Sequence, residues 1–500
     1  MTAVAHPRSR VEAALRLGPW PARLGVIVGA ALIALLTQGE AILVAAVGAL
    51  LVGVLVIIWP DVAALAAVGL LFSNATVVAV REHGAPGALA LVIPVLLLLA
   101  AGHQVLARHQ PVLFPRPMVW VVALLVVQLA SALASRDPDQ SVAAALTFLV
   151  EGLVLFALLV NAVRGTQLVR AAALVLVVTA GLLGTLSLIQ QVSGSDGQDF
   201  AGFATMSDAV IGRADGGGSP RHAGPIGEQN RWAQSLAVVL PVAIALGVAD
   251  RSRSARLTAR ISAVGIVAGI VLTYSRGAAV GLVLTALIGI ALRWIRASTA
   301  VVAAAAVVVL LAAIAPNFAA RASTVVSARS SVAARTSADV PQDGSFANRY
   351  TEAVAATAVF FRHPVIGVGP GLFPTYFQDE ARAQGADRIV GVNREAHDLY
   401  LGLAAELGVL GLVAFGGFTA SLFASLARAR RAFARTRSDV SALATGFALA
   451  IVTYLTTGLF LHFAYIRYFW LLAALSAATG MLATVDDPIP PGSSRTREAP

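Results

Sequence analysis

The chain has 500 residues, of which 58% are apolar and only 12% are charged. A water-soluble globular chain of this length would carry more charge, so the composition predicts a protein of the lipid bilayer. The absence of cysteine excludes disulfides and thiolate metal sites. A net charge of +10 would point to nucleic acid in a soluble protein. In a membrane chain the location of each charge matters more, and we expect no nucleic-acid partner.

Apolar runs of about 20 residues, the length that crosses a hydrocarbon core, recur along the chain. They predict an all-α polytopic membrane protein with about 12–14 transmembrane helices. The predicted spans are residues 24–38, 41–58, 62–80, 87–106, 118–135, 141–161, 168–191, 231–249, 258–274, 277–293, 298–315, 398–426, 440–461 and 466–485.

Arginine supplies all 36 basic residues, and its distribution predicts the orientation. With a cytoplasmic N-terminus, the expected inner loops collect most of the arginines, whereas short outer loops hold one each or none. The inner groups are Arg108 and Arg116; Arg164 and Arg170; Arg251, Arg253, Arg256 and Arg260; Arg293 and Arg296; and Arg428, Arg430, Arg431, Arg435 and Arg437. We therefore expect a multi-pass protein of the cytoplasmic membrane with both termini inside. The first apolar run lacks a convincing cleavage site, so we expect an uncleaved first helix.

Two connections are too long to be simple turns, and both are expected outside. The predicted organisation is a basic cytoplasmic segment (1–23), an N-terminal transmembrane bundle (24–191), an extracytoplasmic loop (192–230), central helices (231–315), a large extracytoplasmic loop (316–397), C-terminal helices (398–485) and a cytoplasmic tail (486–500). The first loop is rich in Gly, Ser and Asp. The larger loop contains a helical pattern in "NRYTEAVAATAVFF" and ends its helix with proline and glycine. We expect function to reside in these loops.

Arginines on the expected outer face are candidates for binding an anion. Arg276 lies between two closely spaced spans, where it needs an anionic partner or serves as an interfacial anchor. Arg221 and Asn230 precede the span at 231, where loop polarity and a helix start are the alternative reading. Arg349 has a simple alternative partner in Glu352, one helical turn later.

Charged residues crowd the start of the span at 398, in "REAHDLYLGL". His397 is a candidate proton acceptor or phosphate ligand. Asp398 is a secondary candidate, although a helix N-cap is the preferred interpretation. The short loop "SRDPDQS" places Asp137 and Asp139 at the spacing of a metal-binding pair, but such residues more often cap the next helix. The glycines of "GVGPGLF" favour a tight turn over a phosphate loop.

Four stretches, in order, resemble elements of the O-antigen ligase and O-antigen polymerase family of bacterial envelope glycan enzymes. They are "RHAGPIGEQNRWAQSLAVVLP", "TYSRGAAVGL", "NRYTEAVAATAVFFRHPVIGVGPGLF" and "EAHDLYLGLAAELGVLGL", which together cover roughly residues 220–412. One position departs from the family pattern, because Asp398 stands where the family usually has Asn after the histidine.

The resemblance implies a metal-independent, inverting glycosyltransferase of the GT-C type, with no cofactor and no bound metal. It implies a polyprenyl-pyrophosphate-linked glycan as donor, a glycan, lipid or protein as acceptor, the lipid bilayer as surroundings and an active site facing outside. The resemblance also implies that Arg221, Arg276 and Arg349 bind the pyrophosphate. His397 and Arg276 are the candidate catalytic residues.

Two other functions are also compatible with the sequence. A transporter or flippase of a lipid-linked or anionic substrate would place charge near mid-membrane, where Glu151 is the main acidic residue of a predicted span. A metal-dependent glycosyltransferase would use Asp137 and Asp139. The sequence does not separate a ligase from a polymerase.

Overall fold

The computed structural model describes residues 59–195, 197–211, 219–296, 298, 344–383, 394–461 and 466–485. The predicted spans 24–38 and 41–58, nearly all of 298–315, and the terminal segments 1–23 and 486–500 lie outside these ranges. Each of the other predicted spans coincides with a helix or a bent helix pair.

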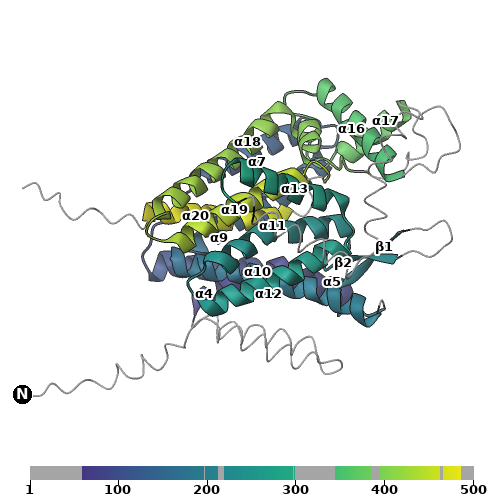
Figure 1. The fold of residues 1–500 in the computed structure, drawn as a ribbon. Coiled ribbons are helices and arrows are strands. Elements are labelled where there is room, and N and C mark those ends of the chain that lie inside the picture. Colours follow the sequence, from purple (N-terminus) through teal and green to yellow (C-terminus); the bar gives the residue numbers. More distant parts are fainter. Residues whose placement is uncertain are drawn as a thin grey trace, which may run out of the picture.

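Long apolar helices lie side by side in a bundle (Figure 1). They are α4 (Pro60–Ser73), α5 (Ala75–His83), α6 (Val92–Gly102) between the short helices η1 (Gly87–Leu91) and η2 (His103–Ala107), α7 (Arg116–Leu133), α8 (Pro138–Phe148), which continues through η3 (Leu149–Val154) into α9 (Leu155–Ala162), α10 (Gly165–Ser193), α11 (Gln229–Ala249), α12 (Arg253–Leu272), α13 (Arg276–Ala291), α18 (Leu399–Phe433), α19 (Ser438–Thr457) and α20 (Ile466–Val485). Within the described ranges, 8 helices are long and apolar enough to cross a membrane, or up to 9 if the bent pair α4 and α5 is one span. The predicted all-α polytopic membrane fold is confirmed.

Two predicted spans differ in detail from the helices observed. The span predicted at 62–80 is the pair α4 and α5, bent by 52° at Asn74, whose φ is 59°. The span predicted at 398–426 is longer, because α18 continues to Phe433.

Glycines let the backbones of α10 and α12 approach closely. A Cβ atom built on Gly184 would lie 2.2 Å from the carbonyl oxygen of Gly265, and one on Gly265 would lie 2.4 Å from that of Gly181. Small residues at such crossings let membrane helices pack backbone to backbone. This contact ties α12, and with it the start of α13, to the long helix α10.

The two long loops contain regular structure at one end of the bundle (Figure 1). The 192–230 segment, expected only as a loop, holds an antiparallel pair, β1 (Thr205–Ile211) and β2 (Ser219–Gly224). Sequence alternation was too weak to reveal so short a hairpin. The larger loop holds α16 (Gly344–Arg362) and α17 (Phe373–Ala383), in agreement with the helical pattern predicted there.

The turn between α16 and α17 supplies hydrogen-bond acceptors to α18 at a break in that helix. Gly408 has non-helical angles, φ 63° and ψ −161°. The freed amides of Val409 and Leu410 donate to the carbonyl oxygens of Pro364 (2.8 Å) and Val365 (3.2 Å). A helix break is tolerated at a membrane when other backbone groups satisfy its hydrogen bonds. The loop is therefore bonded directly to a spanning helix.

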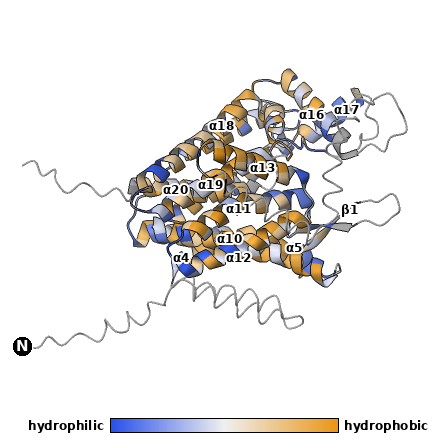
Figure 2. Cartoon of the chain, viewed as in Figure 1, coloured by the Kyte–Doolittle hydropathy of each residue, from blue (hydrophilic) through white to orange (hydrophobic). Residues whose placement is uncertain are grey.

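Hydrophilic residues gather at the ends of the bundle, whereas its helices are hydrophobic along most of their length (Figure 2). We call the end at which α11, α13 and α18 begin the site end. At the opposite end, the nearly buried Asp439 accepts ion pairs from Arg170, Arg251 and Arg437 at 3.3–3.9 Å. Three arginines of the predicted inner loops thus connect the helices at that end through ion pairs.

Candidate functional site

The arginine of β2 meets the start of α11 and the α12–α13 turn. The Nε atom of Arg221 donates to the carbonyl oxygen of Thr273 (2.8 Å), and its Nη2 atom donates to Oδ1 of Asn230 (3.3 Å). The Oγ atom of Ser275 donates to the same Oδ1 atom (3.0 Å). One amide oxygen therefore joins two sequence motifs that lie 45 positions apart.

The same turn positions Arg276 as the first residue of α13. Tyr274 has a positive φ of 52°, which reverses the chain after α12. Ser275 is the N-cap of α13, and its hydroxyl accepts from the amide of Ala278 (3.4 Å). A helix N-terminus favours a nearby anion, and here a half-buried arginine stands at that terminus. The local structure thus suits a phosphate group.

The start of α11 is connected to the 394–398 segment by Arg231. Glu228 caps α11 by accepting from the amides of Asn230 (3.1 Å) and Arg231 (2.7 Å). The Nη2 atom of Arg231 donates to Oε2 of Glu395 (3.3 Å). Burial raises the pKa of Glu395 above its ordinary value, and the charges of Arg231 and His397 oppose that rise. The pair brings the start of α11 and the 394–398 segment together.

His397 contacts a nearly buried carboxylate from α16. Its Nδ1 atom lies 3.0 Å from Oε2 of Glu352, whose side chain is 1% exposed. Arg394 donates to the other oxygen, Oε1, at 2.9 Å. His397 itself has a positive φ of 44°. A non-glycine residue in this conformation is uncommon and is held by its surroundings.

Asp398 is the N-cap of α18, as preferred from the sequence. Its Oδ1 atom accepts from the amides of Tyr400 (2.8 Å) and Leu401 (2.9 Å). Burial raises the pKa of the Asp398 carboxyl, and these two hydrogen bonds counteract the shift. An asparagine would cap the helix through its side-chain oxygen in the same way, so the cap itself does not need a negative charge.

Arg349 lies on α16, one turn before Glu352, and is half-buried. The sequence offered Glu352 as its simple partner. The structure instead shows Glu352 in contact with Arg394 and His397. Arg349 therefore stands on the helix that supplies the histidine's carboxylate partner.

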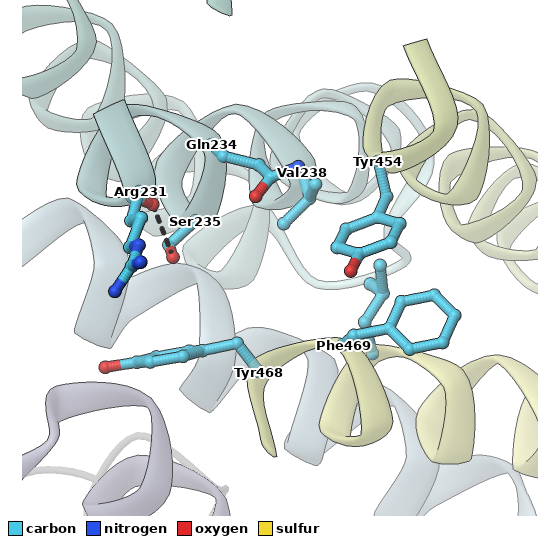
Figure 3. Close-up of a pocket in the computed structure, with 8 residues that line it drawn as sticks. Arg231, Gln234, Ser235, Val238, Tyr454, Tyr468 and Phe469 are labelled. Atoms are coloured by element: carbon cyan, nitrogen blue, oxygen red, sulfur yellow. Dashed lines mark hydrogen bonds between the residues drawn. The ribbon is translucent and has the colours of Figure 1, made fainter. Parts of the chain in front are cut away.

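A small cavity adjoins this network between α11, α19 and α20 (Figure 3). Arg231, Gln234 and Ser235 supply polar groups on the α11 side, and Tyr454, Tyr468 and Phe469 face them. Gln234 donates to the hydroxyl of Thr457 at 2.9 Å. Arg231 therefore lines this cavity and also pairs with Glu395.

The alternative aspartate pair has a structural explanation at one of its members. Asp137 caps α8 by accepting from the amide of Gln140 (3.1 Å). Among the residues that the structure describes, no group of three or more His, Asp or Glu side chains is placed to hold a metal ion.

Sequence reasoning missed Arg231, Ser275, Glu352 and Arg394 as parts of the network. Arg231 follows the chosen Asn230 directly, and Glu352 was considered only as a partner of Arg349. Long-range pairing decided their importance, and local spacing does not reveal such pairing. The quoted motifs nevertheless contain all four residues.

The fold and this polar network define a polytopic α-helical membrane protein with an elaborated site at one end of its bundle. Residues 261–416 match the model of a protein family described as O-Antigen ligase. The match confirms the resemblance to the O-antigen ligase family. It includes Arg276, Arg349, His397 and Asp398, whereas Arg221 and Asn230 precede it. No curated protein matches the chain.

Proposed function

We propose that the chain is a membrane glycosyltransferase that transfers or polymerises a glycan from a polyprenyl-pyrophosphate donor at the outer face of the cytoplasmic membrane. The observation that carries the proposal is the hydrogen-bonded joining of Arg221, Asn230 and Ser275 at the N-terminus of α13, beside Arg276. Cationic side chains and a helix N-terminus at one point suit a pyrophosphate. The family match supports a glycan-assembly role.

The proposed reaction forms one bond and breaks one bond. An acceptor hydroxyl oxygen bonds to the anomeric carbon from the face opposite the leaving group, which inverts the configuration. The bond between that carbon and the phosphate oxygen breaks, and its electron pair leaves with the polyprenyl pyrophosphate. His397 takes the hydroxyl proton, and Arg221, Arg276 and Arg349 stabilise the charge on the leaving group without a metal.

A deletion strain tests the cellular role and separates two versions of the proposal. If the chain is a ligase, its loss leaves fully polymerised glycan on the lipid carrier. If it is a polymerase, its loss leaves single repeat units there. An unchanged pool of carrier-linked glycan would contradict both versions.

A chelator tests the metal-independent mechanism against the alternative based on Asp137 and Asp139. Purified enzyme should keep its transfer rate in excess chelator, and Asp137→Asn with Asp139→Asn should leave the chemistry unchanged. Loss of activity in chelator, restored by a divalent cation, would favour the aspartate pair.

A further inference from the structure

Glu352 is the nearly buried acid that faces the candidate base. It comes from α16, whereas His397 comes from the segment before α18, so the contact joins the large loop to a spanning helix. The other charged groups around the histidine are Arg394, Glu395 and Asp398 on its own segment, and Arg231 of α11 through Glu395. Among them, Glu352 is the carboxylate within 3.0 Å of the ring.

The neighbours of Nδ1 decide which ring nitrogen carries hydrogen. Nδ1 forms a hydrogen bond with the carbonyl oxygen of Glu395 (3.0 Å), and Oε2 of Glu352 lies 3.0 Å from Nδ1 as an ion-pair contact outside hydrogen-bond geometry. The carbonyl oxygen accepts and neither neighbour donates, so Nδ1 must carry a hydrogen. In the neutral ring the lone pair is then on Nε2, which is the form a proton acceptor needs.

We propose that Glu352 is a positioning residue whose buried carboxylate stabilises hydrogen on Nδ1 of His397 electrostatically, beside the hydrogen bond to the Glu395 carbonyl oxygen, and so keeps the lone pair on Nε2. Arg394 bonds the second oxygen of the carboxylate and so fixes the carboxylate itself. A third group that orients the base is a recurring requirement of acid–base sites. The inference rests on the proposed function for its kinetic consequence, but the tautomer assignment does not.

Kinetics of Glu352 variants in nanodiscs test the positioning role. Glu352→Gln should lower kcat at least about tenfold, equivalent to ~1.4 kcal/mol, while KM for the lipid-linked donor changes little. Glu352→Asp should recover part of the loss. In a His397→Ala background, Glu352→Gln should cause no further loss of kcat, because the group it positions is gone.

Glu380→Gln is the matched control. Glu380 is a nearly buried acid of the same loop, and it pairs with Arg362 and not with the histidine. If Glu380→Gln lowers kcat as much as Glu352→Gln, or if the Glu352 loss persists in the His397→Ala background, Glu352 has only a structural role and the proposal is overturned.

Nitrogen NMR of ¹⁵N-histidine-labelled protein gives a readout that needs no substrate. The His397 signal, assigned by its absence in His397→Ala, should show hydrogen on Nδ1 in the wild type and a larger fraction of the Nε2–H form in Glu352→Gln, where only the Glu395 carbonyl still favours hydrogen on Nδ1. An Nε2–H wild type would overturn the proposal even if transfer is observed. If the wild type shows the Nδ1–H form but transfers no glycan, the proposed function fails and the positioning stands.

Large apolar side chains are exposed where the loop meets α18. Phe361 and Val365 are 73% and 60% exposed, and Val409, Leu410 and Val413 of α18 beside them are 44–54% exposed. The backbone bonds from Val409 and Leu410 to Pro364 and Val365 hold the two sets at one level. The surface is thus continuous with the lipid-facing side of a spanning helix.

Helix length places this surface at the boundary of the hydrocarbon core. From Leu410 to Arg428, α18 rises about 27 Å at ~1.5 Å per residue, close to the ~30 Å thickness of a hydrocarbon core. With Arg428 at one boundary, Leu410 lies at the other. We infer that the end of α16 and the turn after it are seated in the lipid at the site end, with Phe361 and Val365 in contact with acyl chains.

Single-cysteine labelling tests this seat directly, because the natural chain has no cysteine. An environment-sensitive fluorophore at Phe361→Cys should be quenched by lipids carrying a nitroxide near the headgroup, as should one at Val413→Cys. A fluorophore at Arg382→Cys, on the exposed side of α17, should not be quenched. Quenching at 413 but not at 361, or at neither, would overturn the inference.

Discussion

Oδ1 of Asn230 accepts a hydrogen bond from Oγ of Ser275 at 3.0 Å, and this contact joins the start of α11 to the start of α13. Because Arg221 donates to the same oxygen, the contact also orients an arginine next to the turn that carries Arg276. We infer that the amide of Asn230 organises the proposed pyrophosphate-binding part of the site without itself needing to touch the substrate.

Asn230→Ala should therefore weaken both stability and transfer. Removing the shared acceptor leaves two donors unsatisfied in a partly buried site, which costs about 1–3 kcal/mol. The thermal midpoint should fall, and the transfer rate should fall at least about tenfold, ~1.4 kcal/mol. The control is Gln140→Ala, which removes an exposed hydrogen bond to Gly371. Equal effects of the two variants would contradict a special role for Asn230.

Asp398 variants separate helix capping from other roles. Asp398→Ala should destabilise the start of α18 by about 0.5–2 kcal/mol, because two amides lose their acceptor. Asp398→Asn should keep the cap and most of the activity. Thermal unfolding of the three proteins at neutral pH measures the difference. An Asn variant as damaged as the Ala variant would show that the negative charge itself is required.

The raised pKa of Asp398 also predicts a pH dependence. A carboxyl whose pKa is higher in the folded state stabilises the fold at low pH, and that contribution is lost as the pH rises from the unfolded value, 3.8, through the folded value. The Asn side chain does not titrate. The stability of Asp398→Asn relative to the wild type should therefore increase as the pH rises through this window, and the opposite trend would contradict the shift.

Gly408 and Gly416 form a matched pair within α18. A Cβ atom at Gly408 would lie 2.4 Å from the backbone of Val365, and the φ of 63° is unfavourable for alanine, whereas nothing lies within 4 Å of a Cβ at Gly416. Gly408→Ala should cost more than about 2 kcal/mol and loosen the loop, measured by unfolding and by proteolysis of 363–372. Gly416→Ala should be neutral or stabilise by about 0.5–1 kcal/mol. If both variants are as stable as the wild type, the backbone contacts between the loop and α18 do not have the proposed role.

Removal of the candidate pyrophosphate-binding arginines should lower the efficiency of glycan transfer. Arg276→Ala and Arg349→Ala should each lower kcat/KM at least about tenfold, because each removes a charge proposed to stabilise the leaving pyrophosphate. Arg253→Ala, at the opposite end of the bundle, serves as the control and should have little effect. Near-normal activity in both site variants would remove these residues from the proposed site.

Apolar run length was sufficient to predict the helices, because a bilayer admits few other structures for such runs. It did not predict the bend at Asn74, the break at Gly408 or the β1–β2 hairpin. These depend on contacts with distant residues, such as the bond from Asn74 to the carbonyl oxygen of Pro225 (2.9 Å). Local spacing correctly identified the caps at Asp137 and Asp398.

The site was predicted less completely than the fold. The motifs placed Arg221, Asn230 and Arg276 in stretches that the structure brings together. The partnership of Glu352 with His397 crosses 45 positions and two elements, and nothing in the local pattern of "NRYTEA" specifies it. Pairing within the large loop depends on the folded position of α16, which sequence spacing alone does not give.

The most direct measurement is transfer in vitro by the purified protein in lipid nanodiscs, from a polyprenyl-pyrophosphate-linked glycan to an acceptor. The proposed function predicts a new glycosidic bond of inverted configuration, release of polyprenyl pyrophosphate, and at least about a tenfold loss of rate in His397→Ala. Movement of the intact lipid-linked substrate across vesicles without formation of a glycosidic bond would contradict the glycosyltransferase proposal and support a transporter.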